Sequence, residues 1–307
     1  MIYEYKHKNI TWVDLENPTT EEIKNIADRF DIDPMVAGEL LIPTLRSRVD
    51  YYKDYIYLIL LFPISSASSI ENSNEKVQEV DFIIGEKFII TTRYSAVDAL
   101  LEFSKVFEVH SILNKGNMSN HAGYIFYYML QFLYKSLLNR LANIRDLLSD
   151  IENKIFSGNE KTMVKEISKI DRFLLNYSEC TSLHKDVLES FSVVGEKFFK
   201  DDFSYYLHSI IGEYLKVKNE MTGIKEYLAE LRNTNDSLLS TKQNEIMKVL
   251  TVINFIFLPL ALIAALFNMN TETLPIVGAP NDFYIILGVM AVLTILMFLY
   301  FKRKKWL

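Results

Sequence analysis

The chain has 307 residues, a formal net charge of −6 and a single cysteine, Cys180. One cysteine excludes an intrachain disulfide and is typical of a reducing compartment, and the acidic balance argues against bulk nucleic-acid binding. The first residues contain no apolar run, so we expect no cleavable signal peptide. No phosphate-binding loop, dinucleotide fingerprint or HExxH motif is present, so we expect neither an enzyme nor a resident cofactor.

Residues 1–95 carry a mixture of strand and helix signals, which predicts an N-terminal cytoplasmic α/β part. The pattern predicts strands at 10–15 and 49–61, helix starts at 17–22 and at Asp33-Pro34, and a hairpin of 77–84 and 87–92 about Gly85-Glu86. The Ser- and Asn-rich stretch 65–76 is typical of a loop.

Strand signals end near residue 95, and helical patterns follow at 96–109, 120–156, 160–198 and from about 203 onward. We assign 96–202 to a cytoplasmic helical part and 203–248 to a stalk helix. Apolar residues spaced three and four apart predict a packing stripe on this stalk, made of Tyr214, Val217, Met221, Ile224, Leu228, Leu231, Asn235 and Leu238.

Two uncharged apolar runs, 249–267 and 283–301, lie near the C-terminus. Each has about 19 residues, and a helix needs roughly 20 to cross a bilayer core. The only charged residues in the connection 268–282 are Glu272 and Asp282. The tail 302–307 instead begins with four basic residues, Lys302, Arg303, Lys304 and Lys305. Because Lys and Arg concentrate on the cytoplasmic side, we expect both termini inside the cell and the loop outside. The pattern therefore predicts a multi-pass protein of the cell (inner) membrane.

The first apolar run carries a second stripe on one helix face, which predicts a pore lining. Its members are Asn244, Met247, Thr251, Asn254, Leu258, Ala261, Ala265 and Asn268. Polar ends and a smooth apolar middle are typical of a pore with a hydrophobic constriction. The same residue types also serve helix packing, so periodicity leaves both interpretations open. Two spans cannot enclose a channel, so conduction would require an oligomer.

Three segments together resemble the CorA magnesium transporter family: residues 244–260, Asn268-Met269-Asn270 and the tail 302–307. The segments at 11–15, 46–52 and 89–92 agree more loosely. The resemblance implies an α+β cytoplasmic domain, a long stalk helix and two transmembrane helices per subunit, assembled as a homopentameric funnel. It also implies passive transport of a divalent cation, magnesium first and cobalt or nickel next. The implied partners are further copies of the chain, membrane lipid and divalent cations, with no nucleic acid.

The family's Gly-Met-Asn motif lies at the outer pore mouth, where the resemblance places Asn268, Met269 and Asn270. Magnesium sheds water reluctantly, so amide oxygens that accept hydrogen bonds from its hydration shell can select the hydrated ion. Asn268 replaces the motif's glycine. Asn is the next most tolerant residue of a left-handed backbone, so we expect the turn to survive.

In this family, cytoplasmic magnesium closes the channel by binding between subunits at a pair of acids and a partner Asp. The resemblance places Gly38 and Glu39 at the pair and Ser209 at the partner position, so Glu39 is the acid that remains. One carboxylate is a poor divalent site. We expect weak closure by magnesium at Glu39, or closure through other acids such as Asp201 and Asp202.

Several alternatives remain open. Family members with modified motifs include the zinc transporter ZntB, so a zinc transporter of that type is one. A non-conducting, membrane-tethered scaffold is another. Cys180 and His184 lie four apart and could hold a metal, although without a second pair a chance arrangement is favoured. The basic tail either sets the topology alone or also acts as an electrostatic brake on the pore.

Overall fold

The structure is a computed structural model that describes residues 1–63, 77–108, 121–199, 203–269, 281–304 and 306. The chain forms two compact units, Met1–Arg232 and Asn233–Leu307. One long helix, α7 (Ser204–Phe267), belongs to both. The loop predicted at 65–76 lies outside the described residues.

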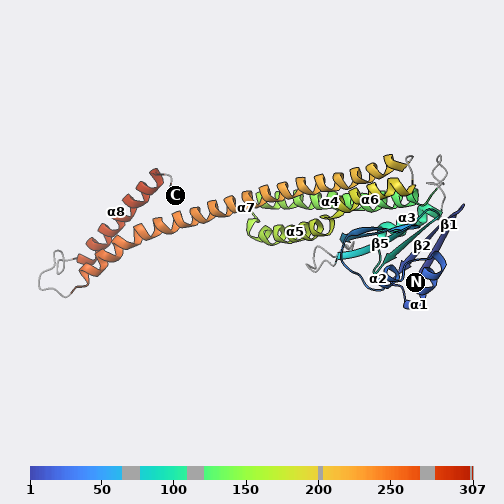
Figure 1. Cartoon of the computed structure of the whole chain (residues 1–307). Coiled ribbons are helices and arrows are strands. Elements are labelled where there is room, and N and C mark those ends of the chain that lie inside the picture. Colours follow the sequence, from blue (N-terminus) through green and yellow to red (C-terminus); the bar gives the residue numbers. More distant parts are fainter. Residues whose placement is uncertain (64–76, 109–120, 200–202, 270–280, 305, 307) are drawn as a thin grey trace. The chain divides into compact units, whose positions relative to one another are not determined.

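The first unit contains a six-stranded sheet in the order β1-β2-β6-β5-β4-β3 (Figure 1). Its strands are β1 (Ile2–His7), β2 (Ile10–Glu16), β3 (Arg48–Tyr51), β4 (Tyr55–Pro63), β5 (Val77–Gly85) and β6 (Phe88–Arg93). Strands β2 and β6 run parallel, and the other neighbouring pairs are antiparallel. The predicted strand at 10–15 and the hairpin about Gly85-Glu86 are thus confirmed. A Cβ at Gly85 would lie 2.3 Å from the Phe88 ring, so glycine fits this turn best.

The single strand predicted at 49–61 is wrong, because two antiparallel strands, β3 and β4, occupy this stretch. The Tyr52 amide donates to the Tyr55 carbonyl over 3.0 Å and closes the turn between them. The polar pair Lys53-Asp54 fills that turn and interrupts the apolar run. Strand β1 was not predicted, since as an edge strand it is mostly exposed and lacks a clear apolar alternation.

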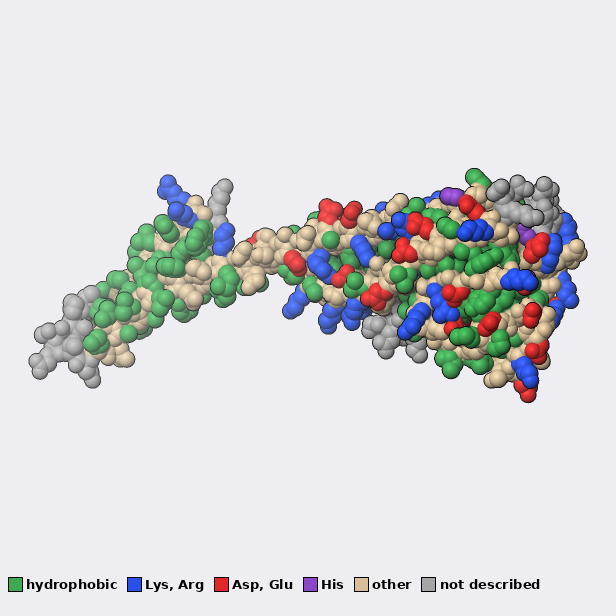
Figure 2. Space-filling model, viewed as in Figure 1, with side chains coloured by type: hydrophobic (Ala, Val, Ile, Leu, Met, Phe, Trp, Pro, Cys, Tyr) green, Lys and Arg blue, Asp and Glu red, His purple; other side chains and the backbone are tan. Residues whose placement is uncertain are grey.

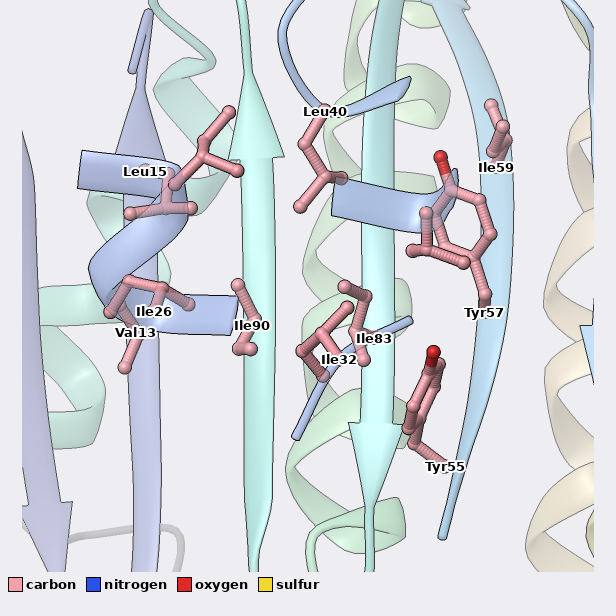
Figure 3. Close-up of a cluster of buried hydrophobic side chains, with 12 residues drawn as sticks. Val13, Leu15, Ile26, Ile32, Leu40, Tyr55, Tyr57, Ile59, Ile83 and Ile90 are labelled. Atoms are coloured by element: carbon pink, nitrogen blue, oxygen red, sulfur yellow. The ribbon is translucent and has the colours of Figure 1, made fainter. Parts of the chain in front are cut away.

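Helices α1 (Thr20–Phe30) and α2 (Pro34–Glu39) begin where the caps predict. Thr19 and Glu22 form a capping box, and the Asp33 carboxylate accepts from the Met35 amide over 2.8 Å. Both helices cover one face of the sheet, where a buried apolar cluster joins them to it (Figure 3). Its members include Val13, Leu15, Ile26, Ile32, Leu40, Tyr55, Tyr57, Ile59, Ile83 and Ile90.

The first unit also contains the start of α7 and four further helices: α3 (Asp98–Glu108), α4 (Gly123–Phe156), α5 (Glu160–Thr181) and α6 (His184–Phe199). Aromatic pairs tie α3 and α4 to the sheet, with Trp12 5.4 Å from Phe103 and Phe82 5.2 Å from Phe126 between ring centroids. The helical pattern predicted over 160–198 is confirmed except at Ser182 and Leu183, where the chain turns between α5 and α6.

The stripe predicted on α7 is confirmed as a packing face. Its positions from Tyr214 to Asn235 are buried and Leu238 is half-buried. The helix then continues without interruption to Phe267, with Pro259 inside it. In the second unit, the last part of α7 is followed by α8 (Asp282–Arg303).

Candidate functional site

Helices α7 and α8 are both long and apolar enough to cross a membrane by length and composition. They contain the predicted spans 249–267 and 283–301. Hydrophobic side chains gather on the spans of the second unit, whereas charged side chains are spread over the first unit (Figure 2). Little of either apolar segment is buried within the chain. An apolar surface of this size requires lipid or further protein to cover it.

One face of the span in α7 is partly covered. Besides Thr251, the least exposed positions of the span are Val252, Ile256, Pro259, Leu260, Ile263 and Phe267. They recur at intervals of three and four and therefore share one side of the helix. The rings of Phe255 and Phe301 lie 6.2 Å apart, in a contact between α7 and α8.

The predicted pore lining occupies the opposite face of the same span. At about 100° per residue, its mean direction lies about 180° from the partly covered face. Thr251 is half-buried, and the other members are exposed: Asn244, Met247, Asn254, Leu258, Ala261 and Ala265. The Thr251 hydroxyl donates to the Met247 carbonyl over 2.7 Å, so it satisfies its own donor within the helix. This face is thus left largely uncovered within the chain.

Asn268 and Met269 form a turn directly after α7. The Asn268 amide donates towards the carbonyls of Ala264 and Ala265 at 3.1 and 3.2 Å. Among the described residues, neither Asn268 nor Met269 has a positive φ. Asn268, which replaces the motif's glycine, therefore does not adopt a left-handed backbone. The tolerance of Asn for that conformation is not needed at this position. Asn270 and Glu272 lie outside the described residues.

The residue expected to regulate closure, Glu39, lies at the end of α2 and is engaged in an ion pair. Its carboxylate accepts from the guanidinium of Arg48, a β3 residue whose Nε also lies 2.8 Å from Asp50. The hydrogen bond to Glu39 raises the pKa of Arg48. Ser209 shares a 3.3 Å hydrogen bond with the Tyr127 hydroxyl. Asp201 and Asp202 lie outside the described residues.

No metal centre forms within the described part of the chain, where no three His, Cys, Asp or Glu side chains are grouped to hold an ion. His184 contacts protein with both ring nitrogens, at 3.0 Å from the Tyr134 hydroxyl and 2.8 Å from the Leu61 carbonyl. A metal would have to displace one of these partners. Cys180 and His184 are both buried, so we interpret them as core packing residues and not as metal ligands. Burial lowers the pKa of His184 to about 4.

The basic residues Lys302, Arg303 and Lys304 are exposed at the end of α8, and Lys305 lies outside the described residues. The Lys304 amide donates to the Tyr300 carbonyl over 3.1 Å, and the Trp306 amide does the same to Phe301. The tail therefore folds back against the helix end.

Sequence reasoning missed Arg48 as the partner of Glu39. The contact depends on the pairing of β3 with β4 and on the end of α2, so no local pattern signals it.

Comparisons with known proteins agree on one family. A family model described as "CorA-like Mg2+ transporter protein" matches residues 7–303. The cobalt/magnesium transport protein CorA of Thermotoga maritima is 24% identical over 299 residues, which cover 97% of this chain and 83% of that protein.

Among solved structures, the complete CorA magnesium transporter of Methanocaldococcus jannaschii matches with a TM-score of 0.83 at 19% identity. That match covers 99% of this chain and 93% of the other. The ZntB cytoplasmic domain of Vibrio parahaemolyticus gives a TM-score of 0.54 at 16% identity, over 76% of this chain and 88% of that one.

Proposed function

Because the chain belongs to the CorA-like Mg2+ transporter family, we propose that it is a divalent-cation transporter whose physiological ion is magnesium and whose working form is a homopentamer. The observation that carries the pore is the exposed face of α7 that holds Asn254, Leu258 and Ala261, opposite the partly covered face. Five copies of this face around an axis would enclose a passage with polar ends and an apolar middle.

Selection would occur at the outer mouth, where Asn270 contributes an amide from each subunit. Amide oxygens accept hydrogen bonds from the water around magnesium, so they can hold the hydrated ion without removing its shell. Asn268 would add a second set of amides, and Met269 would lie between the two. Glu272 and Asp282 would raise the local cation concentration.

Transport would be passive and driven by the membrane potential. A divalent ion gains about 4.6 kcal/mol per 100 mV when the interior is negative. The basic residues at 302–305 support a topology with both termini in the cytoplasm and the protein in the inner membrane.

The test is ion uptake into proteoliposomes with magnesium, zinc, cobalt and nickel, measured alongside the oligomeric state by native mass spectrometry. Magnesium uptake that is lost in Asn270→Ala and Asn254→Leu, with the pentamer retained, would support the proposal. Zinc uptake without magnesium uptake would assign the chain to the zinc alternative. Absence of uptake with all four ions would favour the scaffold.

A further inference from the structure

A cavity of about 500 Å³ opens at the end of α8 that carries the basic tail. Its lining combines aromatic and aliphatic side chains with one cation: Phe255, Leu296, Met297, Tyr300, Phe301, Lys304 and Trp306. This volume lies within the range of about 300–1,000 Å³ that is typical of ligand pockets. The described residues that line the cavity include no carboxylate.

The cavity is built by contacts between three segments. Phe301 is 7% exposed and forms its inner wall. The ring of Phe255, on α7, lies 6.2 Å from Phe301, and the ring of Trp306, on the tail, lies 5.9 Å from it at 30°. The hydrogen bond from the Trp306 amide to the Phe301 carbonyl, 3.1 Å, holds the tail in this position. The apolar walls are thus fixed by both helices and by the returning chain.

The position of the single cation suggests the chemistry of the occupant. Lys304 stands at the end of α8 and lines the cavity together with the exposed apolar side chains of Leu296 and Tyr300. Within the described part of the chain, no carboxylate pairs with Lys304. A ligand that fits must offer an apolar chain to the aromatic walls and a negative group to the ammonium. The cavity also lies on the surface of the apolar spans, where the surrounding solvent would be lipid.

We propose that this cavity binds one anionic phospholipid, with an acyl chain against Phe255 and Phe301 and the phosphate at Lys304. The proposal rests on the membrane topology of the proposed function, because the basic tail then faces the cytoplasmic leaflet, where anionic lipids attract basic residues. The bound lipid would fill the gap between α7 and α8 and hold the tail, with Trp306 at the interface level that suits its amphipathic ring.

The test uses the full-length protein in detergent with phosphatidylglycerol as the probe and phosphatidylcholine with the same acyl chains as the neutral comparison. Lipid retention is measured by native mass spectrometry. We expect selective retention of phosphatidylglycerol and about a fivefold loss in Lys304→Gln, the factor for one basic residue near an anionic surface. Lys302→Gln is the matched control, because it removes the same charge two residues earlier, from a side chain that does not line the cavity. Retention that falls equally in both variants, or in neither, overturns the proposal.

A second pair of variants tests the apolar walls. Leu296→Trp places a large ring in the cavity, whereas Leu299→Trp adds the same ring at an exposed α8 position outside it. We expect lipid retention to fall in the first variant alone. If Leu296→Trp instead retains the lipid, the lipid binds outside the cavity and the proposal is wrong. Retention does not depend on uptake, so a failure of transport with intact, Lys304-dependent lipid binding would overturn the proposed function alone.

Discussion

The carboxylate of Glu39 is bound by the guanidinium of Arg48, so the acid at the end of α2 is tied to strand β3. Both side chains are partly exposed, at 29% and 36%. The same guanidinium also reaches Asp50. Glu39 is thus already paired within its own chain, and a divalent ion would have to compete with Arg48 for its carboxylate.

We therefore predict that Glu39 contributes little to closure by cytoplasmic magnesium. Glu39→Gln should change the internal magnesium concentration that half-inhibits uptake by less than about twofold, because a single paired carboxylate supplies too few oxygens for a divalent site. Arg48→Gln is the control, since it leaves Glu39 and Asp50 without their shared cation and should strengthen closure. Complete loss of magnesium inhibition in Glu39→Gln would contradict the prediction.

Thr251 and Thr294, one in each span, make the same hydrogen bond within their helices, so replacing each in turn tests the proposed pore face. Thr251 donates to the carbonyl four residues earlier over 2.7 Å, and Thr294 does so over 2.8 Å. Thr251→Val should lower magnesium uptake severalfold, because it removes a hydroxyl from the polar end of the pore. Thr294→Val should leave uptake unchanged, since Thr294 lies on α8. Equal rates in both variants would argue that Thr251 does not face the pore.

His184 makes the stability of the first unit depend on pH. Its Nε2 donates to the Leu61 carbonyl and its Nδ1 accepts from Tyr134, which requires the neutral ring. Burial lowers the pKa from 6.5 to about 4, so the unfolded chain binds the proton first as pH falls. The stabilisation is complete above pH 6.5 and is lost progressively towards pH 4, by on the order of 3 kcal/mol at about 1.36 kcal/mol per pKa unit.

Thermal unfolding of the full chain between pH 7.5 and 4.5 measures this effect, with His184→Gln as the variant that cannot titrate. We expect the variant to be less stable at pH 7.5 and to lose less stability on acidification. Burial also lowers the pKa of His121 to about 4, so the variant's pH dependence should become shallower without vanishing. An identical slope in both proteins would show that His184 is not the titrating group.

Replacing Arg93, a buried arginine at the end of β6, should lower the free energy of unfolding more than replacing the exposed Arg29. Arg93 is fully buried, with Nε 3.1 Å from Asp14 and Nη1 3.1 Å from Glu16. Burial raises the pKa of Asp14 despite this cation. Arg93→Met should destabilise the chain by about 3–5 kcal/mol, because it leaves the Asp14 carboxyl buried without its cation.

Arg29→Met is the matched control for this prediction. Arg29 holds Glu4 through two bonds of 2.9 Å, and both groups are exposed. Solvent screens such pairs, so we expect a loss of no more than about 1 kcal/mol. Denaturant unfolding of both variants measures the difference, and similar losses would contradict the assigned role of burial.

The sequence by itself determined the features that depend on local periodicity. The two spans, the packing stripe of α7, the β5–β6 hairpin and the caps at Thr19 and Asp33 each follow from residues within one segment. Their physical causes are apolar spacing, turn chemistry and satisfaction of the first helical amides, all of which act over a few residues.

Only the tertiary structure decided the features that join distant segments. A turn separates α5 from α6, and just after it His184 contacts Tyr134 and the Leu61 carbonyl, which belong to elements far away in sequence. The ion pair of Glu39 likewise needs the β3–β4 turn, and the cavity needs Phe255 and Trp306 brought against Phe301. These contacts are possible because packing and strand pairing bring the segments together, and no local propensity encodes which distant partner a side chain will meet.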